Sequence, residues 1–209
     1  MLSPSFQRLS LAAAVVTMTL GGQTKTIGQE PDVKKPLMFS EATLPEGFPA
    51  AGPVNEVIVK TYPAHRLARV RAEGGNNSMF MKLFNHIKRN EIAMTAPVEM
   101  SWPAVGKEPE AMAFLYGKAT LGQPGADPND PQVIIEDIPE ITVASIGLRG
   151  GYDKATLDRG GRQLEDWLAK APAWRAAGVR RTLAYNSPFV PGFAKYSEVQ
   201  IPIAPAVAE

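Results

Sequence analysis

The chain has 209 residues, of which 44% are hydrophobic and 21% charged, with a net charge of +1 and no cysteine. This length and apolar content predict one folded domain with extensions and do not favour global disorder. The lack of cysteine excludes disulfides, a thiol nucleophile and thiolate ligation of a metal, and the small net charge gives no electrostatic reason to expect a nucleic-acid partner.

The N-terminal residues have the pattern of a secretory signal. Arg8 precedes an uncharged, mostly apolar run from Leu9 to Leu20, and the small residues Gly21 and Gly22 follow it. The run is shorter than the about 20 residues that a membrane span needs. We therefore expect residues 1–22 to be a cleaved signal peptide, the mature protein to be exported (periplasmic or secreted), and no membrane span to remain. The alternative is an N-terminal helix of a cytosolic protein.

Residues 23–52 contain several prolines and little hydrophobic periodicity, which predicts a flexible linker before a domain at 53–204. The domain begins with Val57–Val59 and Leu67–Val70, which predict a pair of strands around Tyr62-Pro63.

The next segment, Ser78 to Arg89, predicts an amphipathic helix that ends near Asn90. At about 100° per residue, one broad arc of this helix carries the apolar side chains Met79, Phe80, Leu83, Phe84 and Ile87. His86 lies on the border of the arc. Such a stripe usually packs in a core, but part of it is also suited to line a cleft.

The remaining segments predict further strands and a second helix. The helix is expected at Ala155–Ala171, and extended segments at Thr95–Met100, Ala111–Gly117, Val133–Ile135, Ile141–Leu148, Leu183–Tyr185 and Tyr196–Ile203. Residues 123–131 are expected to form a loop. The order of strands, helix and strands therefore occurs twice, which predicts an α+β fold with a mainly antiparallel sheet and two similar halves.

The segment from Asn90 to Met100 has the sequence Asn-Glu-Ile-Ala-Met-Thr-Ala-Pro-Val-Glu-Met. It resembles the signature of the SOUL haem-binding protein family, which is related to the wider GyrI-like small-molecule-binding superfamily. The pair Tyr62-Pro63, the strand and glycine pair at 143–151, and Tyr185–Pro188 followed by Glu198-Val199 also occur in the family's order. The resemblance covers roughly residues 53–204.

This resemblance implies a curved antiparallel sheet, a distorted barrel of about eight strands, with two helices on it. It also implies non-covalent binding of haem or a related tetrapyrrole in an apolar cleft, by a carrier or buffer that is not an enzyme. The expected cleft residues are Met79, Phe80, Leu83, Phe84, His86 and Ile87.

His86 is the expected metal ligand, because a neutral imidazole is the commonest protein ligand of haem iron. Met79 and Met94 are the alternatives, and His65 could equally point to water. The cations near in sequence, which could pair with porphyrin carboxylates, are Arg66, Arg69, Lys82 and Lys88. Two departures from the family are that many members have an aromatic residue at the position of His86, and that residues 187–191 lack a basic residue found in some relatives.

Two other functions remain open. The chain could be a small-molecule-binding module of the same fold with no role in haem binding, or a hydrolase of the wider superfamily. A hydrolase would need a carboxylate in the cleft, for which Glu99 is a candidate. Neither histidine has a metal-binding spacing, and the sequence contains no Gly-x-Ser-x-Gly or phosphate-binding glycine motif.

Overall fold

The computed structural model describes residues 42–72, 75–187 and 189–206. The predicted signal peptide and most of the predicted linker lie outside the described residues. The elements in chain order are β1 (Val57–Tyr62), β2 (His65–Arg71), α1 (Asn76–Arg89), β3 (Val98–Trp102), β4 (Ala111–Leu115), β5 (Gly125–Asp127), β6 (Asp130–Ile138), β7 (Ile141–Arg149), α2 (Lys154–Ala169), β8 (Trp174–Ala176), β9 (Arg180–Ala184), η1 (Gly192–Ala194) and β10 (Tyr196–Pro205).

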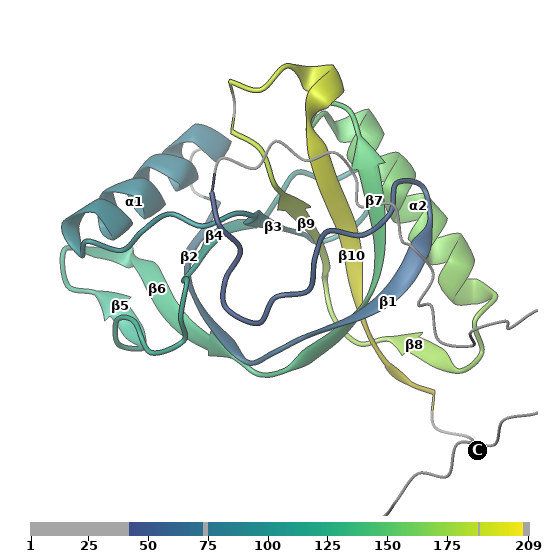
Figure 1. Cartoon of the computed structure of the whole chain (residues 1–209), viewed down its shortest axis with the longest axis horizontal. Helices are drawn as coiled ribbons and strands as arrows, with labels where there is room; N and C mark the ends of the chain where they lie inside the picture. Colours follow the sequence, from purple (N-terminus) through teal and green to yellow (C-terminus); the bar gives the residue numbers. More distant parts are fainter. Residues whose placement is uncertain (1–41, 73–74, 188, 207–209) are drawn as a thin grey trace, which may run out of the picture. The chain divides into compact units, whose positions relative to one another are not determined.

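The strands form one curved sheet of ten strands in the order β1-β7-β10-β9-β3-β4-β2-β6-β5, with β8 paired to β10 (Figure 1). All pairs between these strands are antiparallel. The predicted α+β class with two helices is therefore confirmed. The predicted barrel of about eight strands is corrected to an open sheet, because β1 and β5, at the two ends of the strand order, do not pair with each other.

The sheet confirms the expectation of two similar halves. The first half is β1-β2-α1-β3-β4 and the second is β6-β7-α2-β9-β10. In each half, the first strand pairs with the second strand of the other half, so β1 lies beside β7 and β6 beside β2. The expected pairing between the strands around Tyr62-Pro63 is wrong for this reason, since β1 and β2 each pair elsewhere.

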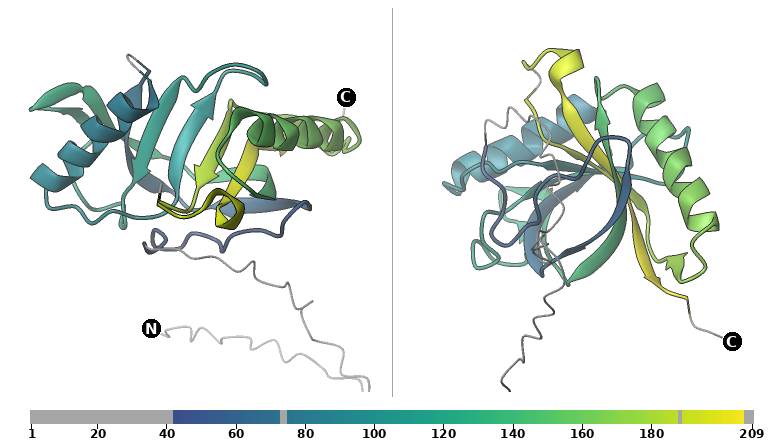
Figure 2. Two further views of the ribbon diagram at one scale, coloured as in Figure 1. Left: turned by 90° about the horizontal axis from the view of Figure 1, so that it is seen from above. Right: turned by 45° about the vertical axis from the view of Figure 1, so that its right-hand side comes forward.

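Both helices cover the same face of the sheet (Figure 2). Met79, Leu83 and Ile87 of α1 pack in one core with Leu157 and Leu164 of α2, together with apolar residues of the strands between them. These five side chains occur at helical spacing, so burial of this face stabilises both helices against the sheet. The sequence therefore predicted the helices well, apart from one or two residues at their ends.

The opposite, concave face is covered by residues 42–54, which cross it without regular secondary structure (Figure 1). Leu44, Phe48 and Ala51 pack on the sheet, and the Phe48 ring contacts Tyr62 edge-on at 5.0 Å between centroids. The expectation of a flexible linker reaching residue 52 is thus wrong for residues 42–52. Their apolar side chains are spaced irregularly, so the sequence showed no periodicity although the segment is part of the core.

Candidate functional site

An apolar pocket of about 710 Å³ lies beside α1, at the point where β3 and β9 meet. This volume falls within the about 300–1,000 Å³ typical of small-molecule sites. The described residues of its wall come from α1, the segment that joins α1 to β3, the end of β9 with the loop that follows it, and the start of the described chain: Ala42, Thr43, Phe80, Phe84, Met94, Thr95, Ala96, Val98, Ala184, Tyr185, Asn186, Ser187 and Phe189.

One wall consists of the segment from Met94 to Val98, which belongs to the signature that the sequence singled out. Its backbone is held in place by the hydroxyl of Thr95, which donates to the carbonyl of Leu115 at 2.6 Å, and by the N–H of Ala96, which donates to the carbonyl of Thr43 at 3.0 Å. The Ala96-Pro97 peptide is cis. The signature therefore shapes the pocket through its backbone as well as its side chains.

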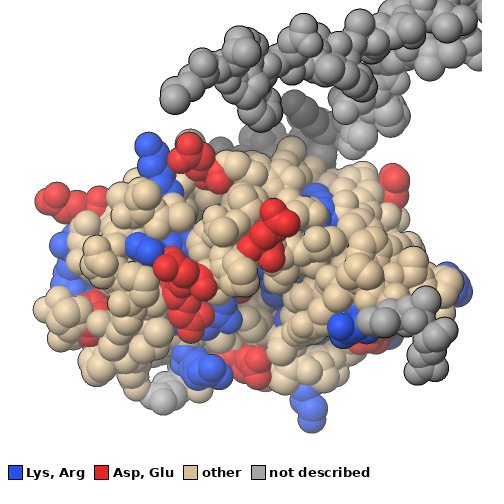
Figure 3. All heavy atoms as spheres, turned by 90° about the horizontal axis from the view of Figure 1, so that it is seen from below, with Lys and Arg blue, Asp and Glu red and all other residues tan. Residues whose placement is uncertain are grey.

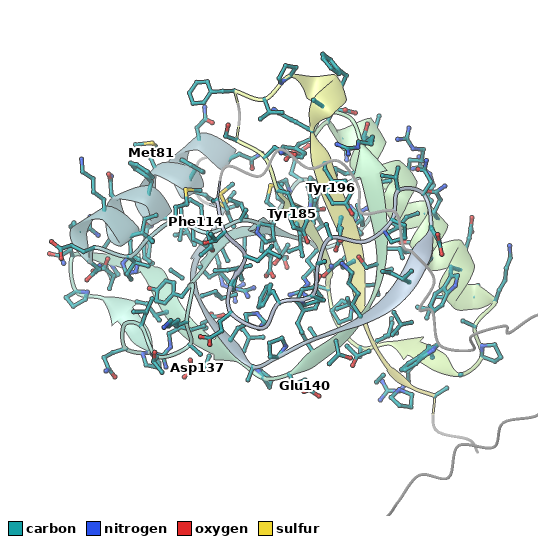
Figure 4. The ribbon with its side chains drawn as sticks, in the orientation of Figure 1. Met81, Phe114, Asp137, Glu140, Tyr185 and Tyr196 are labelled. Atoms are coloured by element: carbon teal, nitrogen blue, oxygen red, sulfur yellow. The ribbon has the colours of Figure 1, made fainter. Side chains whose placement is uncertain are left out.

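The second wall is aromatic. The rings of Phe80 and Phe84 are stacked on α1 with centroids 6.1 Å apart, and Phe80 contacts Phe114 of β4 edge-on at 5.1 Å. Phe114 lies beneath α1 in Figure 4. Phe189, in the loop after β9, is 92% exposed although it borders the pocket. An exposed aromatic ring at the mouth is suited to contact a flat apolar ligand.

The described wall of the pocket carries no Asp, Glu, Lys, Arg or His. Its polar groups are hydroxyls and one side-chain amide. The site can therefore bind apolar surface and donate a few hydrogen bonds, and its described residues include no carboxylate, imidazole or amine that could act as a general base. Nor do they supply a cation.

Only Phe80 and Phe84 of the predicted cleft residues line this pocket. Met79, Leu83 and Ile87 belong to the core between α1 and the sheet, so their assignment to a cleft is corrected. The cause is the width of the apolar arc, since most of it is needed to cover the sheet and only its edge reaches the pocket.

His86 is also buried, only 3% exposed, and does not line the pocket. Its Nδ1 lies 2.6 Å from Oδ2 of Asp127, and its Nε2 lies 2.6 Å from the hydroxyl oxygen of Tyr116. Both ring nitrogens are therefore engaged, and the geometry does not agree with the prediction of His86 as a metal ligand. The other histidine, His65, is buried beneath Phe48, with Nδ1 2.8 Å from the carbonyl oxygen of Pro63.

The predicted rim cations do not lie on the described wall of the pocket. Arg66 forms a two-point ion pair with Asp137, and the ion pairs of Arg69 are with Glu99 and Glu136. Lys82 donates to Gln132. Among the described residues, no group of three or more His, Cys, Asp or Glu side chains could hold a metal ion, and no described helix is long and apolar enough to cross a membrane.

Glu99, the candidate carboxylate of a hydrolase, is buried on the sheet and does not line the pocket. Its carboxylate lies 2.8 Å from Nη1 of Arg181 and 3.5 Å from Nη2 of Arg69. Two guanidinium groups thus balance its charge, which explains how an acid is accommodated there. The three residues border a separate space of about 280 Å³.

A second buried carboxylate, Glu198, anchors the segment that covers the concave face. Lys60 Nζ lies 2.6 Å from Oε1 of Glu198, and Lys60 also donates to the carbonyl of Ala50 at 2.8 Å. The N–H of Gly52 donates to Glu198. Burial would raise the pKa of Glu198, but the charge of Lys60 and these hydrogen bonds hold it below its ordinary value. These contacts hold residues 50–52 against the sheet.

The sequence did not predict the part of the wall formed by Thr43, Tyr185, Asn186 and Phe189. The available signals were the resemblance near Tyr185–Pro188 and the position of Phe189 between two prolines, which is typical of a loop. Neither signal shows that the loop meets α1, since that proximity depends on the pairing of β3 with β9.

The fold and the pocket define a class of α+β domains in which two β-β-α-β-β halves share one open antiparallel sheet, with an apolar pocket beside the first helix. Within that class, the chain belongs to the SOUL heme-binding protein family, whose model matches residues 53–202. No curated protein matches the chain significantly.

Solved structures share the fold at low sequence identity. The C-terminal domain of EcmrR is 16% identical, with a TM-score of 0.52, over 72% of this chain and 98% of that domain. A hydrolase from Listeria innocua is 10% identical, with a TM-score of 0.53, over 73% of this chain and 94% of that one. In a complex of EcmrR with DNA, identity is 15% and the TM-score 0.54 over 72% of this chain, and the match spans only 58% of EcmrR.

Proposed function

We propose that this protein binds haem or a related tetrapyrrole, non-covalently, in the apolar pocket beside α1, and acts as a carrier or buffer rather than as an enzyme. The observation that carries the proposal is that the family's signature segment and the aromatic residues Phe80 and Phe84 line the same pocket. Membership of the SOUL family supports the class of ligand.

The chemistry of the wall fits the faces of a porphyrin. Burial of apolar surface contributes about 25 cal/mol per Å², so a few hundred Å² of ring surface would contribute several kcal/mol before the cost of association. Haem, when bound, would supply the iron chemistry. The residues of this chain would bind the ring, orient it against the aromatic wall and exclude water from one of its faces.

The same wall supports a carrier role, because its described residues include no Asp, Glu, His or Lys that could transfer a proton to a substrate. The experiment is a titration of the full chain with haemin, followed through the Soret band, beside the same titration of a Phe84→Asp variant. A shift that saturates at one equivalent and is weakened in the variant supports the proposal. A broad rise without saturation, equal in both proteins, overturns it.

The uncharged wall also favours a second candidate, an apolar small molecule other than haem. A saturating rise in melting temperature with neutral aromatic compounds, in a protein that shows no saturable change with haemin, would support it.

The mixture of acidic and basic side chains on the face in Figure 3 gives no continuous basic patch there. The absence of a nucleic-acid partner stays a prediction.

Export is likewise proposed, on the sequence pattern of Arg8 followed by the apolar run from Leu9 to Leu20. N-terminal sequencing of the native protein should find that about the first 22 residues have been removed. Recovery of an intact Met1 from the cytosol would contradict export.

A further inference from the structure

The pocket contains few side chains that are able to ligate iron. The protein ligands of haem iron are imidazole, thiolate, thioether and phenolate. Among the described residues of the wall, only Met94 and Tyr185 carry one of these groups. The remaining polar groups, hydroxyls of Thr and Ser and the amide of Asn186, are poor ligands for haem iron.

Tyr185 is not suited to the role. It is 3% exposed, and its ring packs against Tyr196 with centroids 5.3 Å apart (Figure 4). Both residues belong to the buried cluster against which Leu44, Phe48 and Ala51 pack. Burial raises the pKa of Tyr185 well above its ordinary value, so the phenolate that would ligate iron is disfavoured.

Met94 is positioned differently. It is 38% exposed on the pocket wall, whereas Met79 is 1% exposed in the core. The backbone on either side is fixed, because the N–H of Ile92 donates to Ile87 at 2.9 Å and Thr95 donates to Leu115 at 2.6 Å. A flexible, accessible thioether therefore extends from a rigid segment.

From these observations, and resting on the proposed function, we propose that the thioether of Met94 is the axial ligand that this chain gives to haem iron. Both histidines are buried away from the pocket wall, and His86 uses both ring nitrogens. A thioether is a soft, neutral ligand that raises the reduction potential of haem iron. Met94 therefore selects iron porphyrins over metal-free ones and ferrous over ferric haem.

The test uses the full chain, with Met94→Leu beside a matched control, Met81→Leu. Met81 is 50% exposed on α1, points away from the sheet in Figure 4, and does not line the pocket. The probes are haemin, haem reduced with dithionite, and metal-free protoporphyrin. Leucine has nearly the volume of methionine, so the variant removes the sulfur while keeping the apolar wall.

Met94→Leu should change the Soret position and lower the reduction potential of the bound haem. It should also weaken the binding of ferrous haem by about tenfold, which corresponds to about 1.4 kcal/mol. Its affinity for metal-free protoporphyrin should remain that of the parent, and Met81→Leu should match the parent with all three probes. Met94→His should bind haem with the spectrum of an imidazole complex, which shows that position 94 reaches the iron.

Two results would overturn the inference, and only the second would also overturn the proposed function. If the parent binds all three probes and Met94→Leu gives the same spectra and potential, Met94 is not a ligand, while the proposed function stands. If the parent binds neither haem nor protoporphyrin, the proposed function fails and the inference fails with it.

Discussion

Nδ1 of His86 lies 2.6 Å from Oδ2 of Asp127, and this buried pair joins α1 to the end of β5. Tyr116 lies on the other side of the imidazole, and burial raises the pKa of its hydroxyl to about 12, so this group remains a hydrogen-bond donor. The histidine expected to ligate iron is thus a link between secondary structure elements.

Replacing His86 with alanine should therefore reduce stability. The change removes a buried ring, takes the hydrogen-bond partner of the Tyr116 hydroxyl and takes one of the partners of Asp127, which should lower the free energy of unfolding by about 2–4 kcal/mol. Urea unfolding would measure it, with Lys88→Ala, an exposed position on the same helix, as the control. Equal midpoints for His86→Ala and the parent would contradict this structural role.

The same cluster predicts a dependence of stability on pH. Burial would raise the pKa of Asp127, but hydrogen bonds from the N–H of Asn129, from His86 and from Arg89 hold it well below the ordinary 3.8. The folded state then binds fewer protons than the unfolded state, so the stabilisation is present above that ordinary pKa and is lost as the pH falls below it.

Asp127→Asn should accordingly destabilise the protein at neutral pH, and its difference from the parent should shrink as the pH falls towards about 3. Unfolding free energies measured in urea at several pH values would follow this difference. Two curves that stay parallel through the acid range would show that Asp127 does not titrate in this way.

The pocket predicts a separation of binding from stability on α1. Phe84 is 38% exposed and lines the pocket, so Phe84→Asp should weaken protoporphyrin binding by about tenfold or more with little loss of stability. Met81→Asp introduces the same charge outside the pocket and should leave binding unchanged. Fluorescence titration measures affinity and circular dichroism checks the fold; equal affinities in both variants would place the site elsewhere.

The buried pair Lys60–Glu198 predicts non-additive changes in stability. Glu198→Ala leaves Lys60 buried and unpaired and should cost about 3–5 kcal/mol, whereas Lys60→Met with Glu198→Leu should cost much less than the sum of the single changes. Asp137→Ala breaks an exposed pair with Arg66 and should have little effect. Additive losses, measured by urea unfolding, would show that the two buried groups are independent.

Local patterns predicted much of the fold because they act over short distances. The period of Met79, Leu83 and Ile87 indicated α1, and the run from Ile141 to Leu148 indicated β7. The pairing of β1 with β7 and of β6 with β2 could not be predicted, since the packing of the whole sheet decides which strands far apart in sequence pair. The burial of Phe48 depends on the same sheet curvature.

The sequence by itself determined the family, the two helices and the segment that forms one wall of the pocket, because each is encoded in contiguous residues. Only the tertiary structure decided which side chains reach that pocket. An apolar arc on a helix shows what avoids water, but not whether a sheet or a ligand covers it. Leu83 and Ile87 pack against the sheet, and His86 contacts Asp127 and Tyr116. Phe84 and Met94 line the pocket, which lies where β3 pairs with β9.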